Sequence, residues 1–552
     1  MQQNNKHLKK FFICHKILIS IIFLGSVLRL FNINSNPISP YWDEASIGYN
    51  AYSISQTARD EWGKFLPASF QSFGEYKLPG QIYLTVPFTL ILGLNNFSVR
   101  LPSALMGILA IYAIYLLAVK LTEKNHSKRS RDIALFAAFL LATSPWHLQF
   151  SRASFEANSA TTLYIFGIYF LLSSLKKPYR ILFSSLFFSL SFYFYYHTRI
   201  IVPIILIVFV ILYLKSLIKN YKFVIISLLF GLFFCLPILL TFINPASNNR
   251  AKQVSIISLK SPQSNPDFVS AYEKYQSSPI PSNLKDKLAW SDVLFKYYLR
   301  HLDPNFLFVH GDSQIRHRTP NTGQLYYFQI PLVLFSILYL IAKKTREHIF
   351  ALILAFIFPI SAIFSDLTPH ALRSSLGSIN LTILSAFGII WIQKLPNYLK
   401  NTIPIIITLS IGLYLYQYHL ISPKLDSVAW GYGHKELFSY LEKYPNESII
   451  VTGRYWNPYI YYLYYNQFPP KDYQNIADPK IKINNYYFAG AGWDGKEIIS
   501  NNLILKTLQN QKTSIIVTSP AEDSSITINK THIHTINDKE NNPIFLIYKI
   551  SL

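Results

Sequence analysis

Long apolar runs recur through the first three quarters of the chain, and they constrain its fold more than any other feature. A helix of about 20 apolar residues can cross ~30 Å of hydrocarbon. The runs that predict such helices are Phe11–Phe31, Val99–Leu121, Ile133–Thr143, Ala157–Leu175, Ile181–Tyr196, Ile200–Leu214, Phe223–Ile243, Tyr327–Ala342, Ile349–Phe364, Ser374–Ile392 and Thr402–Tyr418. The sequence therefore predicts a polytopic α-helical membrane protein with about eleven transmembrane helices.

Charge and cysteine content narrow the class further. Only 14% of the residues are charged, whereas soluble chains carry about 25%. The formal net charge is +23, but the basic residues stand in short clusters between apolar runs, so membrane topology explains them better than nucleic-acid binding. The two cysteines, Cys14 and Cys235, both lie within apolar runs and indicate no disulfide framework.

The orientation follows from the basic loops, because loops rich in Lys and Arg tend to stay in the cytoplasm. The first run follows three lysines and reads as a retained signal anchor, with the N-terminus inside. The run Gln81–Leu94 is too short to span comfortably and is expected to be an interfacial or re-entrant helix on the outer side. The cytoplasmic loops are then Lys120–Arg131, Lys176–Arg180, Lys215–Lys222, Lys343–Arg346 and Lys394–Lys400.

This topology predicts two domains. Residues 1–420 would form a transmembrane domain with large outer loops at 32–100 and 244–326. Residues 421–552 would form a soluble extracytoplasmic α/β domain, because strand-like runs alternate there with helical patterns such as Lys435–Lys443. The strand-like runs are Ser448–Val451, Ser514–Thr518 and Pro543–Ile550.

Acidic residues near the predicted outer surface are the first candidates for chemistry. Asp43 and Glu44 follow the first span directly, and Glu156 lies in the next short outer loop. Ionisable groups at a bilayer are costly and are functional suspects, and a carboxylate can remove the proton of an acceptor hydroxyl. The alternatives are acids at a helix N-terminus for Asp43 and Glu44, and an ion pair between Arg152 and Glu156 four residues apart on one helix.

Basic residues at the same predicted depth are candidates for binding an anionic group. Arginine donors suit phosphate, and Lys or His adds positive charge. Any one of them could instead extend toward lipid headgroups. The predicted phosphate-binding residues are Lys77, Arg152, His197, Arg199, His370 and Arg373.

Several kinds of chemistry lose support because their motifs do not occur in the sequence. There is no Walker-type loop, no dinucleotide fingerprint, no clustered Cys/His spacing and no Gly-x-Ser-x-Gly motif. No metal site and no cofactor is predicted. A divalent ion on Asp43, Glu44 and Glu156 is chemically possible but not required, because hard cations prefer oxygen ligands.

Three segments carry a family resemblance: Trp42-Asp43-Glu44, Tyr76-Lys77-Leu78-Pro79-Gly80 and Asn96-Phe97-Ser98-Val99-Arg100-Leu101-Pro102. From residue 11 to 214 the chain resembles the protein O-mannosyltransferase and aminoarabinose transferase family of GT-C glycosyltransferases. The resemblance is weaker at His370–Arg373 and absent from the C-terminal domain. It implies catalytic roles for Asp43, Glu44 and Glu156, with Asp43 as the base, and contact between Lys77 and a lipid phosphate. Gly80 stands where the family has a second proline.

The resemblance also implies a substrate and a location. The donor would be a sugar on a polyprenyl phosphate, and the acceptor a hydroxyl of a protein, lipid or glycan at the outer face of the plasma membrane. Transfer in one displacement, with inversion at the anomeric carbon, is expected. Two other readings stay open: a transporter or flippase of lipid-linked sugars without transferase activity, and a non-catalytic scaffold whose outer domain binds cell-surface polymer.

Overall fold

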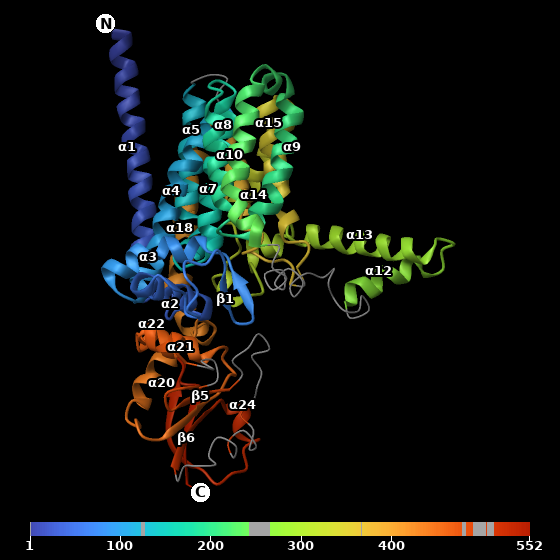
Figure 1. Cartoon of the computed structure of the whole chain (residues 1–552). Coiled ribbons are helices and arrows are strands. Elements are labelled where there is room, and N and C mark those ends of the chain that lie inside the picture. Colours follow the sequence, from blue (N-terminus) through green and yellow to red (C-terminus); the bar gives the residue numbers. More distant parts are fainter. Residues whose placement is uncertain are drawn as a thin grey trace. The chain divides into compact units, whose positions relative to one another are not determined.

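A described helix overlaps each apolar run that the sequence predicts to span the membrane. The computed structural model describes residues 2–122, 127–241, 265–365, 367–476, 482–489, 499, 504 and 513–551, so residues 242–264 of the predicted long outer loop lie outside the described residues. The helices on these runs are α1 Gln2–Leu30, α4 Asn96–Thr122, α5 Lys128–Thr143, α7 Glu156–Ser174, α8 Arg180–Ser191, α9 Tyr196–Lys219, α10 Tyr221–Leu240, α14 Gln329–Lys343, α15 Arg346–Ile357, α16 Gly377–Ala386 with α17 Ile389–Ile392, and α18 Asn397–Tyr416. Figure 1 labels most of them.

By length and composition alone, four of the described helical segments can cross a membrane: Asn96–Thr122, Tyr196–Lys219, Tyr221–Ile238 and Asn397–Leu425. A fifth arises if α5 and α6 (Pro145–Ser151), bent by 56°, count as one broken span. Shorter apolar helices lie at Gly80–Leu92, Arg180–Ser191, Gln329–Lys343 and Gly377–Ile392. The number of about eleven spans stays a prediction. The predicted fold class, a polytopic α-helical membrane protein with a C-terminal sheet domain, is confirmed. The cytoplasmic placement of the N-terminus stays a prediction.

Contacts divide the chain into two compact units. Unit 1 comprises residues 1–31 and 103–418, and unit 2 comprises residues 32–102 and 419–552. The predicted outer loop 32–100 thus packs in the same unit as the C-terminal residues. The proposed division into domains 1–420 and 421–552 stays a prediction.

Most of the long helices of unit 1 form a bundle with nearly parallel axes (Figure 1). Small residues lie at contacts between these helices. Ser184 Oγ on α8 donates to the carbonyl of Gly167 on α7 at 2.8 Å, and Ser185 Oγ donates to Ser227 O on α10 at 2.7 Å. Such hydroxyl-to-carbonyl bonds are a common means of holding helices together where lipid removes the hydrophobic driving force. In α10, only 11% of the apolar stretch Tyr221–Ile238 is buried, as expected for a helix that faces lipid.

Two amphipathic helices follow residue 265 in unit 1. They are α12 (Pro266–Gln276) and α13 (Ser282–Arg300), and α13 runs across the direction of the bundle helices (Figure 1). Asn265 caps α12 by accepting from the backbone N–H groups of Asp267 and Phe268. The predicted long outer loop therefore contains helices of its own.

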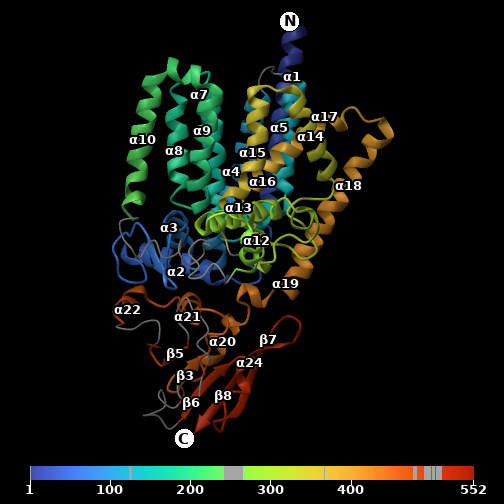
Figure 2. The ribbon, with the colours of Figure 1, turned by 90° about the vertical axis from the view of Figure 1, so that its right-hand side faces the viewer.

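Unit 2 contains a six-stranded mixed sheet in the order β4-β5-β3-β6-β8-β7 (Figure 2). The central strand β3 pairs in parallel with β5 and β6, and β8 pairs antiparallel with β6 and β7. The strands and helices are β3 Ser448–Val451, β4 Lys482–Ile483, β5 Tyr486–Phe488, β6 Thr513–Thr518, β7 Thr531–Asn537, β8 Pro543–Ser551, α19 Ser422–Leu425, α20 His434–Leu441, α21 Pro458–Tyr465, α22 Pro470–Gln474 and α24 Pro520–Asp523. The predicted strands at 448, 514 and 543 and the predicted helix at 435 are confirmed.

The remaining elements of unit 2 come from the predicted outer loop. They are α2 Trp42–Thr57, β1 Phe70–Ser72, β2 Glu75–Lys77 and α3 Gly80–Leu92. α3 lies on the predicted re-entrant run, and its Ile82 packs with Ile47 and Ile54 of α2. Whether α3 crosses the membrane stays open.

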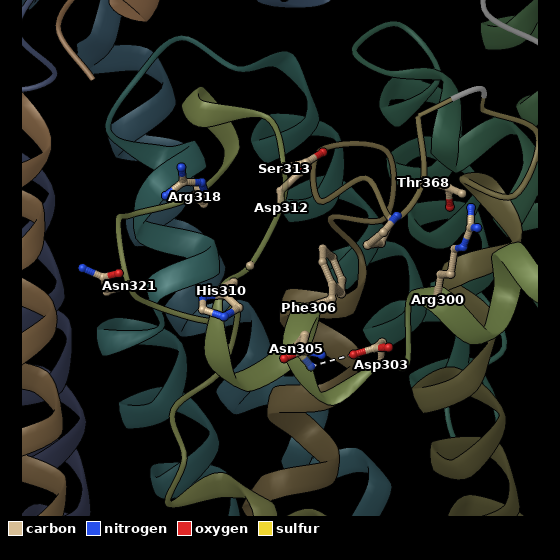
Figure 3. A pocket seen from close by; sticks show the side chains of 12 residues that line it. Arg300, Asp303, Asn305, Phe306, His310, Asp312, Ser313, Arg318, Asn321 and Thr368 are labelled. Carbon is tan, nitrogen blue, oxygen red and sulfur yellow. Dashed lines mark hydrogen bonds between the residues drawn. The ribbon is translucent and has the colours of Figure 1, made fainter. Parts of the chain in front are cut away.

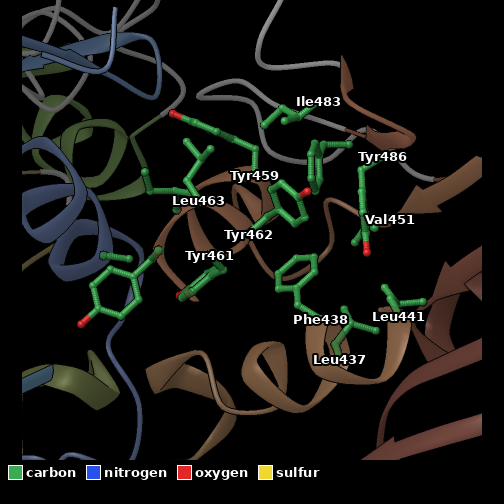
Figure 4. Packing of buried hydrophobic residues seen from close by; sticks show 14 of the residues in the cluster. Leu437, Phe438, Leu441, Val451, Tyr459, Tyr461, Tyr462, Leu463, Ile483 and Tyr486 are labelled. Atoms are coloured by element: carbon green, nitrogen blue, oxygen red, sulfur yellow. The ribbon is translucent and has the colours of Figure 1, made fainter. Parts of the chain in front are cut away.

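One aromatic-rich core joins α2 to the sheet domain. Ala45 and Tyr49 of α2 belong to the same buried cluster as α20, α21 and the sheet, part of which Figure 4 shows. Tyr49 Oη donates to Phe468 O at 3.1 Å, and Gln474 Nε2 donates to Ser53 Oγ at 3.1 Å. The C-terminal domain therefore fixes the position of α2.

Replacing Gly48 by alanine should destabilise this packing. A Cβ at residue 48 would lie 2.7 Å from Val99 Cγ2 and 2.9 Å from a ring carbon of Tyr464, and overpacking of this kind costs about 1–3 kcal/mol. Thermal unfolding in detergent should show a lower midpoint for Gly48→Ala. Gly412→Ala is the control, because a Cβ there meets nothing within 4 Å. Equal midpoints for the two variants would contradict the packing shown here.

Candidate active site

The first turn of α2 carries the two acids that the sequence singles out. Asp43 and Glu44 follow Trp42, the first residue of the helix. Carboxylates are favourable in this position because the unpaired backbone N–H groups give the helix N-terminus a partial positive charge. The expected helix start is thus observed, but each of the two acids also has a specific basic partner.

Asp43 pairs with Lys77. The Lys77 Nζ atom lies 2.8 Å from Asp43 Oδ1, and the lysine side chain is 2% exposed whereas that of Asp43 is 30% exposed. The β1–β2 hairpin delivers Lys77 to this position through a tight turn in which Phe73 and Gly74 both have positive φ. The Phe73 ring then lies 4.6 Å below the ammonium. A partly exposed acid and a buried cation are therefore side by side.

Glu44 is held by Arg100. Both side chains are fully buried, and Arg100 donates from Nε to Oε1 at 2.8 Å and from Nη2 to Oε2 at 3.1 Å. Its other bonds go to backbone carbonyls of the chain just before α2, at Ile33, Pro37 and Ser39. These contacts favour a positioning role for Glu44 rather than contact with a substrate.

Arg100 is a residue that the sequence reasoning did not assign. Its side chain joins the start of α4 to the segment before α2 and to α2 itself. Its position in the motif Asn96–Pro102, one of the segments that carry the family resemblance, could have marked Arg100 as a candidate site residue. A second unassigned neighbour is Trp456, whose ring stacks on Trp42 with centroids 5.5 Å apart.

Glu156 and Arg152 belong to unit 1. Glu156 is the first residue of α7 and is partly exposed, whereas Arg152 caps the C-terminus of α6 and is buried. Arg152 and Glu156 do not lie on one helix as expected, because the chain leaves the helical conformation between α6 and α7. Arg152 donates to Leu28 O at 2.5 Å and Phe31 O at 2.8 Å at the end of α1, and to Tyr418 Oη at 3.1 Å. These bonds favour a structural role for Arg152.

His197 and Arg199 lie in the first turn of α9 in unit 1. His197 is buried. Arg199 donates from Nε and Nη2 to Phe192 O at 3.1 and 2.8 Å, and its guanidinium lies 4.7 Å from the Tyr196 ring centroid. These contacts hold Arg199 against the turn between α8 and α9.

His370 and Arg373 lie in the segment between α15 and α16 in unit 1. Burial, aided by the nearby His317, Arg373 and His301, lowers the pKa of His370 well below its ordinary value. His370 is therefore neutral near pH 7, which weakens the prediction that it supplies positive charge to a phosphate. Arg373 donates to Ser365 Oγ, and its own carbonyl accepts from Ser361 Oγ.

A cavity of about 600 Å³ in unit 1 lies beside this segment (Figure 3). The sequence reasoning did not find it, because its lining comes from three separate stretches of chain. The lining residues are Arg300, Asp303, Asn305, Phe306, His310, Gly311, Asp312, Ser313, Arg318, Asn321, Thr368 and Pro369. The lining is polar and holds both basic and acidic side chains, so it suits a hydrated polar ligand such as a sugar.

The predicted site residues thus fall into two groups. Asp43, Glu44 and Lys77 belong to unit 2, and the structure brings them together with Arg100. The other six belong to unit 1: Arg152, Glu156, His197, Arg199, His370 and Arg373. Convergence of the two groups in one pocket stays a prediction.

The chain is similar to known proteins in part of its sequence and in its fold. The family model described as dolichyl-phosphate-mannose-protein mannosyltransferase matches residues 77–240. The structure of ArnT from Cupriavidus metallidurans bound to undecaprenyl phosphate superimposes with a TM-score of 0.57 at 11% identity, over 96% of this chain and 97% of that chain. The chain has the GT-C glycosyltransferase fold.

The apo oligosaccharyltransferase of Archaeoglobus fulgidus is also similar to this GT-C chain, at 14% identity and a TM-score of 0.49, over 92% of this chain and 69% of that one. No protein with a curated description matches. The family match begins at Lys77 and includes Arg100 and Glu156, whereas Asp43 and Glu44 precede it. The predicted family resemblance is confirmed, and the match and the fold together support an integral membrane glycosyltransferase.

Proposed function

We propose that this GT-C chain transfers a sugar from a polyprenyl-phosphate donor to an acceptor hydroxyl at the non-cytoplasmic face of the membrane, with Asp43 as the general base. The observation that carries the proposal is the ion pair between Asp43 and Lys77. The pair supports the proposal because a carboxylate that can accept a proton lies beside an ammonium that can bind phosphate. This reaction needs both groups, and the sequence carries no nucleotide-binding motif.

The reaction is a single displacement. Asp43 accepts the proton of the acceptor hydroxyl as the hydroxyl oxygen attacks the anomeric carbon. The bond from that carbon to the phosphate oxygen breaks, and the electron pair leaves with the lipid phosphate. Attack opposite to the leaving group inverts the configuration.

Lys77 binds the departing phosphate in this scheme. A lysine ammonium has three N–H donors, so a lysine that pairs with one carboxylate can also donate to a phosphate oxygen. Its burial strengthens that attraction, because electrostatic interactions grow as water is excluded. Glu44 and Arg100 keep the first turn of α2 in place, since Arg100 ties Glu44 to three backbone carbonyls.

Two observations support the proposed donor class: the membrane fold and one similar solved structure. The similar ArnT structure is described as bound to undecaprenyl phosphate, and a donor of that chemistry needs no nucleotide pocket. Glu156, Arg199 and Arg373 of unit 1 keep the roles predicted for them: Glu156 would orient the acceptor, and the two arginines would bind phosphate.

The test is transfer of radiolabelled sugar by the purified full-length protein in nanodiscs, with a panel of polyprenyl-phosphate sugars and with peptide, lipid and glycan acceptors. Label in an acceptor, with inverted anomeric configuration, is expected for at least one donor. If no donor supported transfer and the protein moved labelled donor across vesicle membranes, the transferase proposal would be wrong and the protein would be a flippase.

Lys77→Met should impair use of the donor more than use of the acceptor. Loss of one charged hydrogen bond to phosphate, worth about 1.5–3 kcal/mol, should raise the KM for the donor or lower kcat/KM by roughly 10–100-fold. Lys64→Met, which removes an exposed lysine of the same unit, is the control. An unchanged donor kcat/KM in Lys77→Met would exclude Lys77 from phosphate binding.

A further inference from the structure

Three buried side chains of unit 1 form a cluster that the proposed reaction does not use. Asp312, His317 and His370 each offer one ligand atom, and these atoms all lie within 4.8 Å of one another. The exposed fractions of the three residues are 1%, 7% and 5%. Asp312 and His317 follow α13, whereas His370 lies after α15, so the fold joins residues that are distant in the sequence.

The distances within the cluster suit a metal ion. His317 Nδ1 and Asp312 Oδ2 are 3.2 Å apart, and two ligands in a tetrahedral zinc site with bonds of about 2.0 Å are ~3.3 Å apart. Without an ion the same distance is a hydrogen bond between the imidazole and the carboxylate. The second histidine at this carboxylate, whose ring centroid lies 4.9 Å from that of His317, distinguishes the cluster from an ordinary His–Asp pair.

Neighbouring groups hold the ligands in place. Asp312 accepts backbone N–H bonds from Gln314 at 2.8 Å and Ala371 at 2.6 Å. The backbone N–H of His370 donates to His301 Nε2 at 3.1 Å, which leaves His301 Nδ1 to donate to Tyr297 O at 2.8 Å. The bonds to Asp312 fix the orientation of its carboxylate, as is typical of carboxylate ligands in metal sites. The bond to His301 holds the backbone at His370 in place.

We propose that Asp312, His317 and His370 bind one divalent transition-metal ion of the zinc class. Two imidazoles and one carboxylate favour zinc over magnesium or calcium, which prefer all-oxygen sites. Three protein ligands leave a coordination position for water or for a ligand. Asp312 also lines the cavity of Figure 3, so the ion borders a space that a small ligand can enter.

Such an ion has a defined structural consequence. It links the chain after α13 to the segment between α15 and α16, which also carries Arg373. The metal site can be tested independently of the transfer reaction, because the general base and the phosphate-binding lysine proposed for that reaction are other residues, Asp43 and Lys77.

The test is metal binding by the full-length protein in detergent. The protein is first freed of metal with a chelator and dialysed. Titration with Zn²⁺, followed by mass-spectrometric metal analysis, should then show about one bound ion per chain. Bound Zn²⁺ should also raise the midpoint temperature of thermal unfolding. Loss of a residue that only orients a metal ligand weakens metal binding by about 10–100-fold. Because His317 and His370 are proposed as the ligands themselves, His317→Ala and His370→Ala should each weaken Zn²⁺ binding by more than ~100-fold. His310→Ala is the matched control, because His310 is an exposed histidine of the same cavity.

A second measurement on the unaltered chain protects the test against variants that fail to fold. Co²⁺ added to the metal-free protein should give visible absorption bands of a nitrogen- and oxygen-ligated ion, and Zn²⁺ should displace it. Absence of stoichiometric Zn²⁺ and Co²⁺ binding by the unaltered protein, a preference for Mg²⁺, or unchanged Zn²⁺ affinity in a folded His317→Ala would each overturn the proposal.

Discussion

Asp43→Asn should reduce sugar transfer by about 10²–10⁴-fold, because an amide cannot accept the proton of the acceptor hydroxyl. The substitution keeps the size of the side chain, and Asp43 is partly exposed, so folding should be retained. The measurement is kcat and kcat/KM for transfer from the best polyprenyl-phosphate donor. Binding of that donor should change far less than kcat.

The control is Asp472→Asn, the same chemical change in the first turn of α22 in the same unit. Its transfer rate should stay near that of the unaltered protein. If Asp43→Asn retained full activity, Asp43 would not be the general base, and Glu156 would be the next candidate for that role. If both variants lost activity to the same degree, the loss would reflect the stability of unit 2 rather than proton transfer.

Glu44→Gln should cause the largest loss of stability. It leaves the guanidinium of Arg100 buried without its counter-charge, and breaking a buried ion pair in this way costs about 3–5 kcal/mol. Thermal or chemical unfolding of the purified protein, followed by the fluorescence of the aromatic core of unit 2, should show this loss. Activity should fall with stability, and mild conditions that restore the fold should restore part of it.

Lys530→Gln provides the comparison. Lys530 pairs with Asp523 at 2.5 Å in the same unit, with 15% and 30% of the two side chains exposed, and pairs near the surface contribute about 0–1 kcal/mol. A folded Glu44→Gln protein that is as stable as Lys530→Gln would show that Glu44 does not anchor α2. Complete loss of transfer without loss of stability would instead assign Glu44 a direct part in the reaction.

The aromatic contacts of α2 explain why the C-terminal domain matters to a site that the sequence places in the first outer loop. Trp42 stacks on Trp456, and Tyr49 is bonded to Phe468. Changes in the C-terminal domain can therefore affect Asp43 through the position of α2, without any contact between that domain and a substrate. The sequence assigns the two segments to different predicted domains on the same side of the membrane, and it does not predict the individual contacts between them.

The long apolar runs were enough to predict the helices of unit 1. Inside a bilayer a backbone must satisfy its own hydrogen bonds, and for a single apolar run a helix is almost the only conformation that does so. Short-range patterns also predicted β3, β6 and β8. The partners of single side chains were beyond such patterns: Arg100 pairs with Glu44, Arg152 bonds to the end of α1, and His370 meets Asp312. These contacts join distant parts of the chain, so they depend on how helices and loops pack, and no local preference of the sequence encodes them.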